Sequence, residues 1–468
     1  MQSCIRRRVE RKLYDKEQID WDNVLFDNRT LFWLLFPIII EQFLNSLMGM
    51  VDTMMVSTVG SYAISAVSLV DSINNLVIQI FAAMAAGAVI ICSRCIGSGD
   101  KEESSRAAGQ VVLTVLVISV SITAVCIWGG ERLLRLIFGT VEDSVMENAF
   151  VYFMITAVSY PFLALFSAGA AFYRASGNSK FPTKISVTSN IINIAGNVLL
   201  IYGFQMGVAG AAIATLLSRI FGTVVIYYCL RRPKQIIVVR DYLKIRPDMM
   251  LILNILAIGI PAGIENGMFQ FGKLAISSTV STMGTTAISA QAMTDILENV
   301  NGIFSNGVGI GLMTVVGQCI GAHRKEEAKY YIVKLMGIAQ IGVIVSCLLV
   351  LAMTKPVTWL SGMEPEAAEM CFRLVTVMTI VKPLLWVRAF GIPYGLRAAG
   401  DVKFSMIVSV STMWSCRVAI CIFLVNIFHF GLMGVWIGMF ADWGVRAIIF
   451  TVRFVHGKWL HEDIVIRK

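Results

Sequence analysis

Long apolar stretches dominate this sequence and leave few folds open to it. Each is long enough to cross roughly 30 Å of hydrocarbon as a helix. They lie at about 31–56, 66–92, 107–129, 148–172, 183–203, 207–230, 249–281, 287–317, 331–353, 369–394, 404–427 and 431–454. A chain in lipid must satisfy its own backbone polar groups, which favours helices. The sequence therefore predicts an all-α integral membrane protein with twelve transmembrane helices.

The composition supports this class and excludes others. Hydrophobic residues make up 57% of the chain and charged residues 15%, against roughly 25% charged in soluble domains. The 38 glycines and 10 prolines suit close-packed transmembrane helices better than a β-barrel. Four histidines and one isolated CxxC, Cys92 and Cys95, do not supply a zinc site. With no nucleophile motif either, we expect neither an enzyme nor a bound cofactor.

Charge placement predicts the topology. The charged first 30 residues lack an early apolar core, so we expect no cleaved signal and a retained first span. Lys and Arg gather in the N-terminal tail, in the connections after the even-numbered helices and in the last residues. The positive-inside rule therefore places both termini in the cytoplasm of a multi-pass protein of the plasma (inner) membrane. The net charge of +9 is then a topological signal, and we expect no nucleic acid partner.

The sequence repeats itself with a period near 224 residues. Pro37 and Glu41 match Pro261 and Glu265, and the segment RASGNSKF that begins at Arg174 matches RAAGDVKF further on. Six helices per half give both halves the same orientation, with a pseudo-twofold axis along the membrane normal. The predicted organisation is a cytoplasmic tail (1–30), an N-terminal lobe (31–230), a cytoplasmic linker (231–248), a C-terminal lobe (249–454) and a second tail (455–468).

Several of these segments carry a resemblance to a known family. They are VDTMMVSTVG (51–60), CIGSGDKEESSRAAGQ (95–110), MGVAGAAIATLLSR (206–219) and the two R-A-x-G-x-x-K-F connections at 174–181 and 397–404. From about residue 30 to 455 the chain resembles the multidrug and toxic compound extrusion (MATE) family. The resemblance implies two six-helix bundles around a central cavity. It also implies antiport of small organic compounds against sodium ions or protons.

We expect the transporter to be a monomer surrounded by membrane lipids. The alternative function is a flippase for a lipid-linked precursor, as in distantly related families. In that case efflux of soluble compounds would fail.

Asp52 lies within the first span, where an ionised side chain needs a partner or a purpose. It is either a cation ligand or proton acceptor, or a buried structural acid. In the family the matching acid joins two amides and a hydroxyl in a coupling site, which implies Asn193, Asn197 and Thr215 here. Asp52, Asn193 and Asn197 are candidate ligands of a sodium ion. Some proton-coupled relatives carry an acid at the position of Asn197, and the repeat equivalent of Asp52 is Ile276.

Other polar residues inside the spans are predicted to line the substrate cavity. Glu41 and Glu265 each follow a helix-kinking proline by four residues. The set consists of Glu41, Glu265, Gln270, Lys273, Asp71, Asp295, Asn299, Lys382 and Arg388. The basic members either neutralise nearby acids such as Glu265, Glu298 and Asp295 or bind anionic and zwitterionic substrates.

Overall fold

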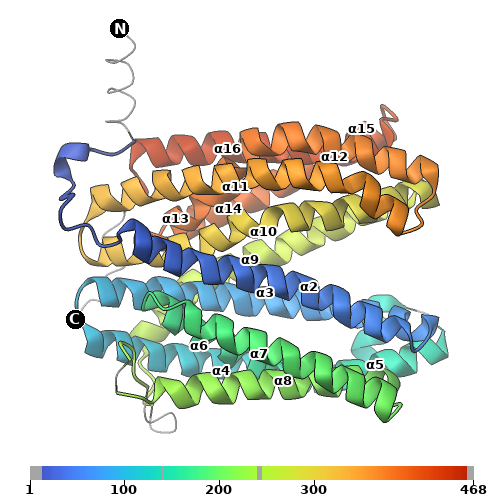
Figure 1. Cartoon of the computed structure of the whole chain (residues 1–468), viewed down its shortest axis with the longest axis horizontal. Helices are drawn as coiled ribbons and strands as arrows, with labels where there is room; N and C mark the ends of the chain where they lie inside the picture. The colour runs from blue at the N-terminus through green and yellow to red at the C-terminus, as the bar shows by residue number, and fades with distance from the viewer. Residues whose placement is uncertain (1–12, 140–141, 234, 240–244, 461–468) are drawn as a thin grey trace. The chain divides into compact units, whose positions relative to one another are not determined.

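The computed structural model describes residues 13–139, 142–233, 235–239 and 245–460. The ends of both predicted tails, 1–12 and 461–468, and linker residues 234 and 240–244 lie outside the described residues. Within the described part all regular structure is helical (Figure 1). The predicted all-α membrane fold is therefore confirmed.

Eleven described helices are long and apolar enough to cross a membrane. The twelfth span is a pair, α5 (Asp143–Val158) and α6 (Tyr160–Ala175), bent by 42° at Ser159. Pro161 lies in the first turn of α6, where its missing N–H is tolerated. The stretch predicted as one span at 148–172 is thus divided between two helices.

The first half of the chain contains the helices up to residue 230. Their bounds are η1 (Lys16–Gln18), α2 (Asn28–Ser57), α3 (Ser61–Gly97), α4 (Lys101–Phe138), α5, α6, α7 (Lys180–Asn197), η2 (Val198–Gly203) and α8 (Gly207–Leu230). Within this half, α3 packs on α6 and α7 packs on α8. The segment η2 is a π-helix that directly continues α7.

The second half repeats this order. Its helices are α9 (Met249–Ser281), α10 (Thr285–Gly321), α11 (Lys325–Leu360), α12 (Pro365–Trp386), η4 (Val387–Gly391), α13 (Ile392–Ala398), α14 (Val402–Thr412), η5 (Met413–Val418), α15 (Ala419–Asn426) and α16 (Gly431–His456). The segments η4 and η5 are π-helices, each continuous with its flanking α-helices. Such segments in α-helices frequently mark functional sites.

The chain divides into two compact units whose bounds fall inside helices. The N-terminal unit comprises residues 36–263, and the C-terminal unit comprises residues 1–35 and 264–468. The divisions lie within α2 and α9, close to Pro37 and Pro261. The predicted lobes, 31–230 and 249–454, stay a prediction.

The segment that precedes α2 packs on the first turns of α11, within the C-terminal unit. The backbone N–H of Asp15 donates to Glu326 at 2.7 Å, and that of Leu25 donates to Glu327 at 2.6 Å. Tyr331 donates its hydroxyl to the Phe26 carbonyl at 2.7 Å and accepts from the Phe26 N–H at 3.0 Å. These contacts hold residues that the sequence predicted only as a tail.

Candidate functional site

Asp52, Asn193, Asn197 and Thr215 come together in the N-terminal unit, from α2, α7 and α8. Asn197 Nδ2 donates to Asp52 Oδ1 at 2.7 Å and is 3.3 Å from Asn193 Oδ1. Asn193 Nδ2 lies 3.2 Å from Thr215 Oγ1. The two amides share a helix face because they are four residues apart. We call these four residues the Asp52 cluster.

The Asn193 amide makes better hydrogen bonds when it is turned over. Its Nδ2 then donates to Asp52 Oδ1 at 2.9 Å, and its Oδ1 accepts from the hydroxyl and backbone N–H of Thr215, each at 3.2 Å. In that orientation both amides donate to the same carboxylate oxygen. The Asp52 carboxylate is thus the acceptor at the centre of the cluster.

Asn197 carries an oxygen without a partner. Its side chain is only 1% exposed, and Oδ1 is a buried acceptor with no hydrogen bond among the described residues. Leaving such a group unsatisfied costs about 1–3 kcal/mol. Carboxylate, amide and hydroxyl oxygens are the ligands that hard cations prefer. The donor set of the Asp52 cluster therefore fits a sodium ion.

Close packing of α7 on α8 brings the amides to Thr215. A Cβ atom on Gly196 would lie 2.9 Å from the Cβ of Ala214, which is closer than real Cβ contacts. Glycine at this position therefore allows the two helices to approach each other. Small residues have this role in many membrane helix pairs.

A second polar group in the N-terminal unit surrounds Asp71. Asn74 donates to Asp71 at 3.1 Å and accepts from the Tyr160 hydroxyl at 2.7 Å. Tyr160 is fully buried, so it packs inside the unit rather than facing a ligand. Arg219 of α8 donates to Ser159 and interacts electrostatically with both Asp52 and Asp71. This arginine supplies positive charge to a region that otherwise holds two acids.

Glu41 and Glu265 each form an ion pair with the arginine of the nearest R-A-x-G-x-x-K-F connection. Arg174 Nη2 donates to both Glu41 oxygens, at 2.6 and 2.7 Å. Arg397 Nη2 donates to Glu265 Oε1 at 2.5 Å. Both acids are buried, at 4% and 8% exposure. The structure thus pairs these acids with arginines rather than with Lys273.

The two connections are also helix-ending turns. Gly177 and Gly400 have φ of 78° and 100°, and each donates its N–H to the carbonyl of the preceding arginine at 2.9 Å. This left-handed glycine at a helix C-terminus is common. Each arginine lies in the last turn of its helix, just before the glycine.

In the C-terminal unit several buried charges form ion pairs. Lys382 is fully buried, and its Nζ donates to Glu298 Oε1 at 2.8 Å while lying over the Trp386 ring at 5.0 Å. Arg446 donates to Asp442 at 2.6 Å. The remaining predicted cavity residues are less enclosed. Asp295, Asn299 and Arg388 are exposed, and Gln270 and Lys273 are half-buried.

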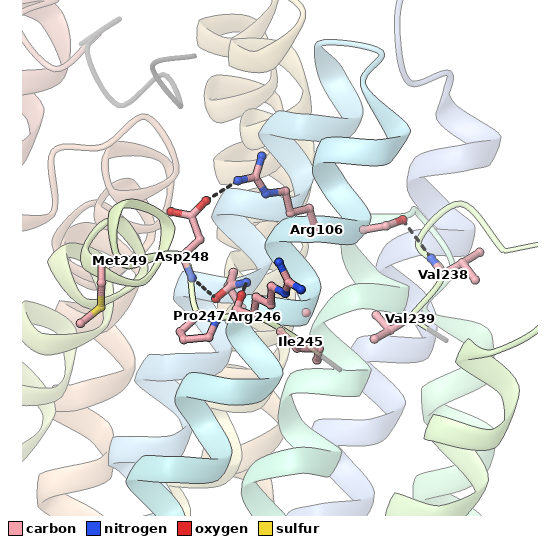
Figure 2. Close-up of a pocket in the computed structure, with 11 residues that line it drawn as sticks. Arg106, Val238, Val239, Ile245, Arg246, Pro247, Asp248 and Met249 are labelled. Carbon is pink, nitrogen blue, oxygen red and sulfur yellow. Dashed lines mark hydrogen bonds and ion pairs between the residues drawn. The ribbon is translucent and has the colours of Figure 1, made fainter. Parts of the chain in front are cut away.

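A pocket of about 730 Å³ lies at the start of α4, where the linker passes. Figure 2 shows Arg106 reaching Asp248 at 2.5 Å. Gln110 donates to the Arg246 carbonyl at 2.8 Å and accepts from the Asp248 N–H at 3.0 Å. The pocket shares no residue with the Asp52 cluster, and its contacts anchor the linker to α4.

The sequence interpretation missed Arg219, Arg417, Asp442 and Arg446. A charged residue inside an apolar span was the available signal, since all four lie within predicted spans. The repeat gives a second signal, because it relates one charged span position to another. In this part of the chain the repeat has a separation of 227 residues, as the match of Met206 with Met433 shows. The same separation relates Arg219 to Arg446 and Thr215 to Asp442.

Comparison with known proteins gives a consistent result. The family model MatE matches residues 37–199 and 261–423, one segment in each half of the repeat. The uncharacterized transporter YisQ of Bacillus subtilis is 26% identical over 453 residues, covering 93% of this chain and 96% of that protein. The probable multidrug resistance protein NorM of Thermotoga maritima is 25% identical, covering 94% and 95%.

Solved structures agree on the fold. An outward-facing multidrug resistance MATE family transporter of the MOP superfamily aligns with a TM-score of 0.85 at 19% identity. The alignment covers 95% of this chain and 98% of that one.

Proposed function

The chain belongs to the MatE family, and on that premise we propose that it is a multidrug efflux transporter that exports small organic compounds in exchange for sodium ions. Membership makes it a multi-pass membrane transporter rather than an enzyme. The exchange with sodium rests chiefly on one observation: the Asn197 side chain donates its NH₂ to Asp52, while its own buried oxygen has no partner. Once the Asn197 amide turns over, a bound cation satisfies this oxygen and the Asp52 carboxylate together.

Sodium binding at the Asp52 cluster changes the hydrogen bonds that join α2 to α7. Without a cation, the partial positive charge of the Asn197 NH₂ faces Asp52 at 2.7 Å. A sodium ion takes over that place, and the amide turns so that its oxygen becomes a ligand. Ion binding thus exchanges a direct link between the helices for one through the ion.

This exchange gives the ion a means of coupling. A ligand shifts a conformational equilibrium only by the difference in its affinity for the two states. An ion that binds one arrangement of α2 and α7 more tightly favours that arrangement. A membrane potential of 100 mV supplies roughly 2.3 kcal/mol for each charge moved across it.

Coupling belongs to the N-terminal unit alone. Ile276 replaces Asp52 in the repeat, so the C-terminal unit lacks the central acceptor. A carboxylate needed only for the shared fold would occur in both units. The asymmetry therefore favours a functional Asp52.

The proposal includes location and assembly. The excess of Lys and Arg in alternate connections supports a plasma (inner) membrane protein with both termini in the cytoplasm. We extend it to a monomer, because each repeat half contains its own six spans.

The test uses purified protein in proteoliposomes. Flux of cationic, zwitterionic and anionic fluorescent compounds is followed under a sodium gradient and, separately, a proton gradient. We expect sodium-driven flux that Asp52→Asn abolishes. Glu131→Gln, which removes an exposed acid paired with Arg135 on α4, is the control and retains flux.

Three results contradict the proposal. Flux driven equally by protons without sodium assigns coupling to protons. Undiminished flux in Asp52→Asn moves the coupling ion to another acid. No flux of any soluble compound favours the lipid-precursor flippase.

A further inference from the structure

The π-helix η5 carries a buried arginine, Arg417, that no acid of the described residues contacts directly. Arg417 is only 8% exposed, and its Nε is buried without an acceptor. Among residues 13–139, 142–233, 235–239 and 245–460, it forms no hydrogen bond and no ion pair within 4.0 Å. Burying a charged group is costly unless it is paired and hydrogen-bonded. An unpaired guanidinium at this depth therefore requires an explanation.

Lys273 of α9 adds a second cation at the same place. The Lys273 ammonium and the Arg417 guanidinium both lie over the Phe269 ring, each 5.3 Å from its centroid. Lys273 likewise has no ion pair within the described part of the chain. A cation–π contact contributes about 0.5–2 kcal/mol, less than a buried charge needs. Two like charges beside one ring also repel each other, and a bound anion that contacts both relieves that repulsion.

The neighbouring charges are already matched within the C-terminal unit. Lys382 pairs with Glu298, and Asp442 pairs with Arg446. Arg446 also donates to Thr412 and to the Ser409 carbonyl, at 2.9 and 2.8 Å. Asp442 and Glu298 also interact electrostatically with Arg417, but Lys273 and Arg417 themselves form no ion pair within 4.0 Å in the described part of the chain.

One acid partly balances them. Asp295 interacts electrostatically with both Lys273 and Arg417, yet it accepts its hydrogen bond from Gln291 at 2.9 Å. Two cations against one exposed carboxylate leave a local surplus of one positive charge.

In the sequence repeat, this surplus corresponds to the position of the Asp52 cluster in the other half. Arg174 and Arg397 are separated by 223 residues, and the same separation relates Ile194 to Arg417. Ile194 directly follows Asn193, whereas Asp52 corresponds to Ile276. The N-terminal unit thus has an acid without a local arginine on α7. The C-terminal unit has the arginine without the acid on α9.

We infer that Arg417 and Lys273, which both lie against Phe269, bind the carboxylate of the transported compound. The guanidinium fork suits a planar carboxylate. The exposed Asp295 carboxylate accepts a hydrogen bond from an ammonium group on the same compound, so zwitterions and anions both fit. This inference rests on the proposed export function and specifies its substrate class.

The test compares acids with their neutral esters. Dansylglycine, 1-naphthoate and pyrenebutyrate are each paired with the methyl ester, and binding to the purified full chain in detergent is followed by probe fluorescence. Wild type is expected to bind at least one acid more tightly than its ester. Arg417→Gln should weaken acid binding about 10–100-fold and leave the ester unchanged. Lys273→Gln should weaken acid binding about tenfold, and Arg417→Lys should restore part of the loss.

Two variants control for the loss of a cation elsewhere. Lys355 lies over the Phe372 ring at 4.7 Å, so Lys355→Gln removes a comparable cation–π contact. Arg373→Gln removes an exposed arginine paired with Glu369. Both should bind acids like wild type. If Arg417→Gln does not fold, Lys273→Gln carries the test, because this half-buried residue has no ion pair to lose.

The outcomes separate this inference from the proposed function. Equal binding of acids and esters by wild type overturns the inference. An equal loss of acid and ester binding in Arg417→Gln also overturns it, because Arg417 would then serve only to balance the charge of Asp442. The measurement uses no gradient. Tighter binding of acids than of esters without sodium-driven flux therefore supports the inference and rejects the sodium antiporter. Sodium-driven flux without tighter binding of acids supports the antiporter and rejects the inference.

Discussion

Removing either partner of the ion pair between Glu41 and Arg174 should strongly destabilise the N-terminal unit. Glu41 is buried and accepts two hydrogen bonds from Arg174, with Thr183 as a third donor at 3.3 Å. Glu41→Ala or Arg174→Ala leaves the other charge buried and unpaired. Breaking a buried pair in this way costs about 3–5 kcal/mol. For a unit of this size, that corresponds to a fall in Tm of roughly 6–20 °C.

The repeat supplies a matched comparison for this pair. Glu265 accepts one bond from Arg397, and its Oε2 is buried without a partner. The Arg397 side chain is 19% exposed, against 12% for Arg174. Water therefore screens the second pair more, and we expect Glu265→Ala to cost about half as much as Glu41→Ala.

Thermal unfolding of the purified protein, followed by tryptophan fluorescence, measures these effects. The double variant Glu41→Ala/Arg174→Ala should lose less than the sum of the single variants, by about 2 kcal/mol, because neither charge is left alone. Arg135→Ala, which breaks an exposed pair on α4, should change the free energy of unfolding by about 0.5 kcal/mol. Additive losses in the double variant would refute the assignment of the pair as a unit.

Three further predictions concern the other polar contacts. Gly196→Val should push α7 away from α8 and weaken sodium-driven flux at least tenfold. Gly267→Ala is the control, because no atom lies within 4 Å of the added Cβ, and it should keep normal flux. Equal fluxes in the two variants would disprove the packing role of Gly196. In thermal unfolding, sodium at 100 times its Kd should stabilise wild type by about 2.7 kcal/mol relative to choline. Asp52→Asn should abolish this difference. A stabilisation of equal size in both proteins would count against a sodium site at Asp52. Lys382→Met should destabilise the chain by about 3–5 kcal/mol by leaving Glu298 unpaired, and adding Glu298→Gln should recover part of the loss; no recovery would contradict the pairing.

The span pattern predicted most of the fold, because a bilayer leaves helices as the main way to bury an apolar backbone. The bend at Ser159 was not predicted, since the apolar run continues through it and only Pro161 marks the break. The grouping of Asp52 with Asn193, Asn197 and Thr215 was predicted through the family resemblance. Spacing alone placed only the two amides on one helix face.

The arginine partners were harder to predict. Arg174 and Arg397 were assigned to connections, where positive charge has a topological reason. Their long side chains carry the guanidinium several ångströms from the backbone, so the sequence position alone does not show which acid the guanidinium reaches. Arg417 escaped notice because hydropathy averages hide one charge among apolar neighbours.

The prolines of α2 and α9 give the chain two points of low bending stiffness. Each proline removes one backbone hydrogen bond from its helix, and both lie within three residues of the place where the helix passes from one compact unit to the other. The segment before α2 is held to α11 by Tyr331 and two glutamates, so it stays with the C-terminal unit when α2 bends. Bending there changes the direction of the helix that carries Asp52 without unwinding it.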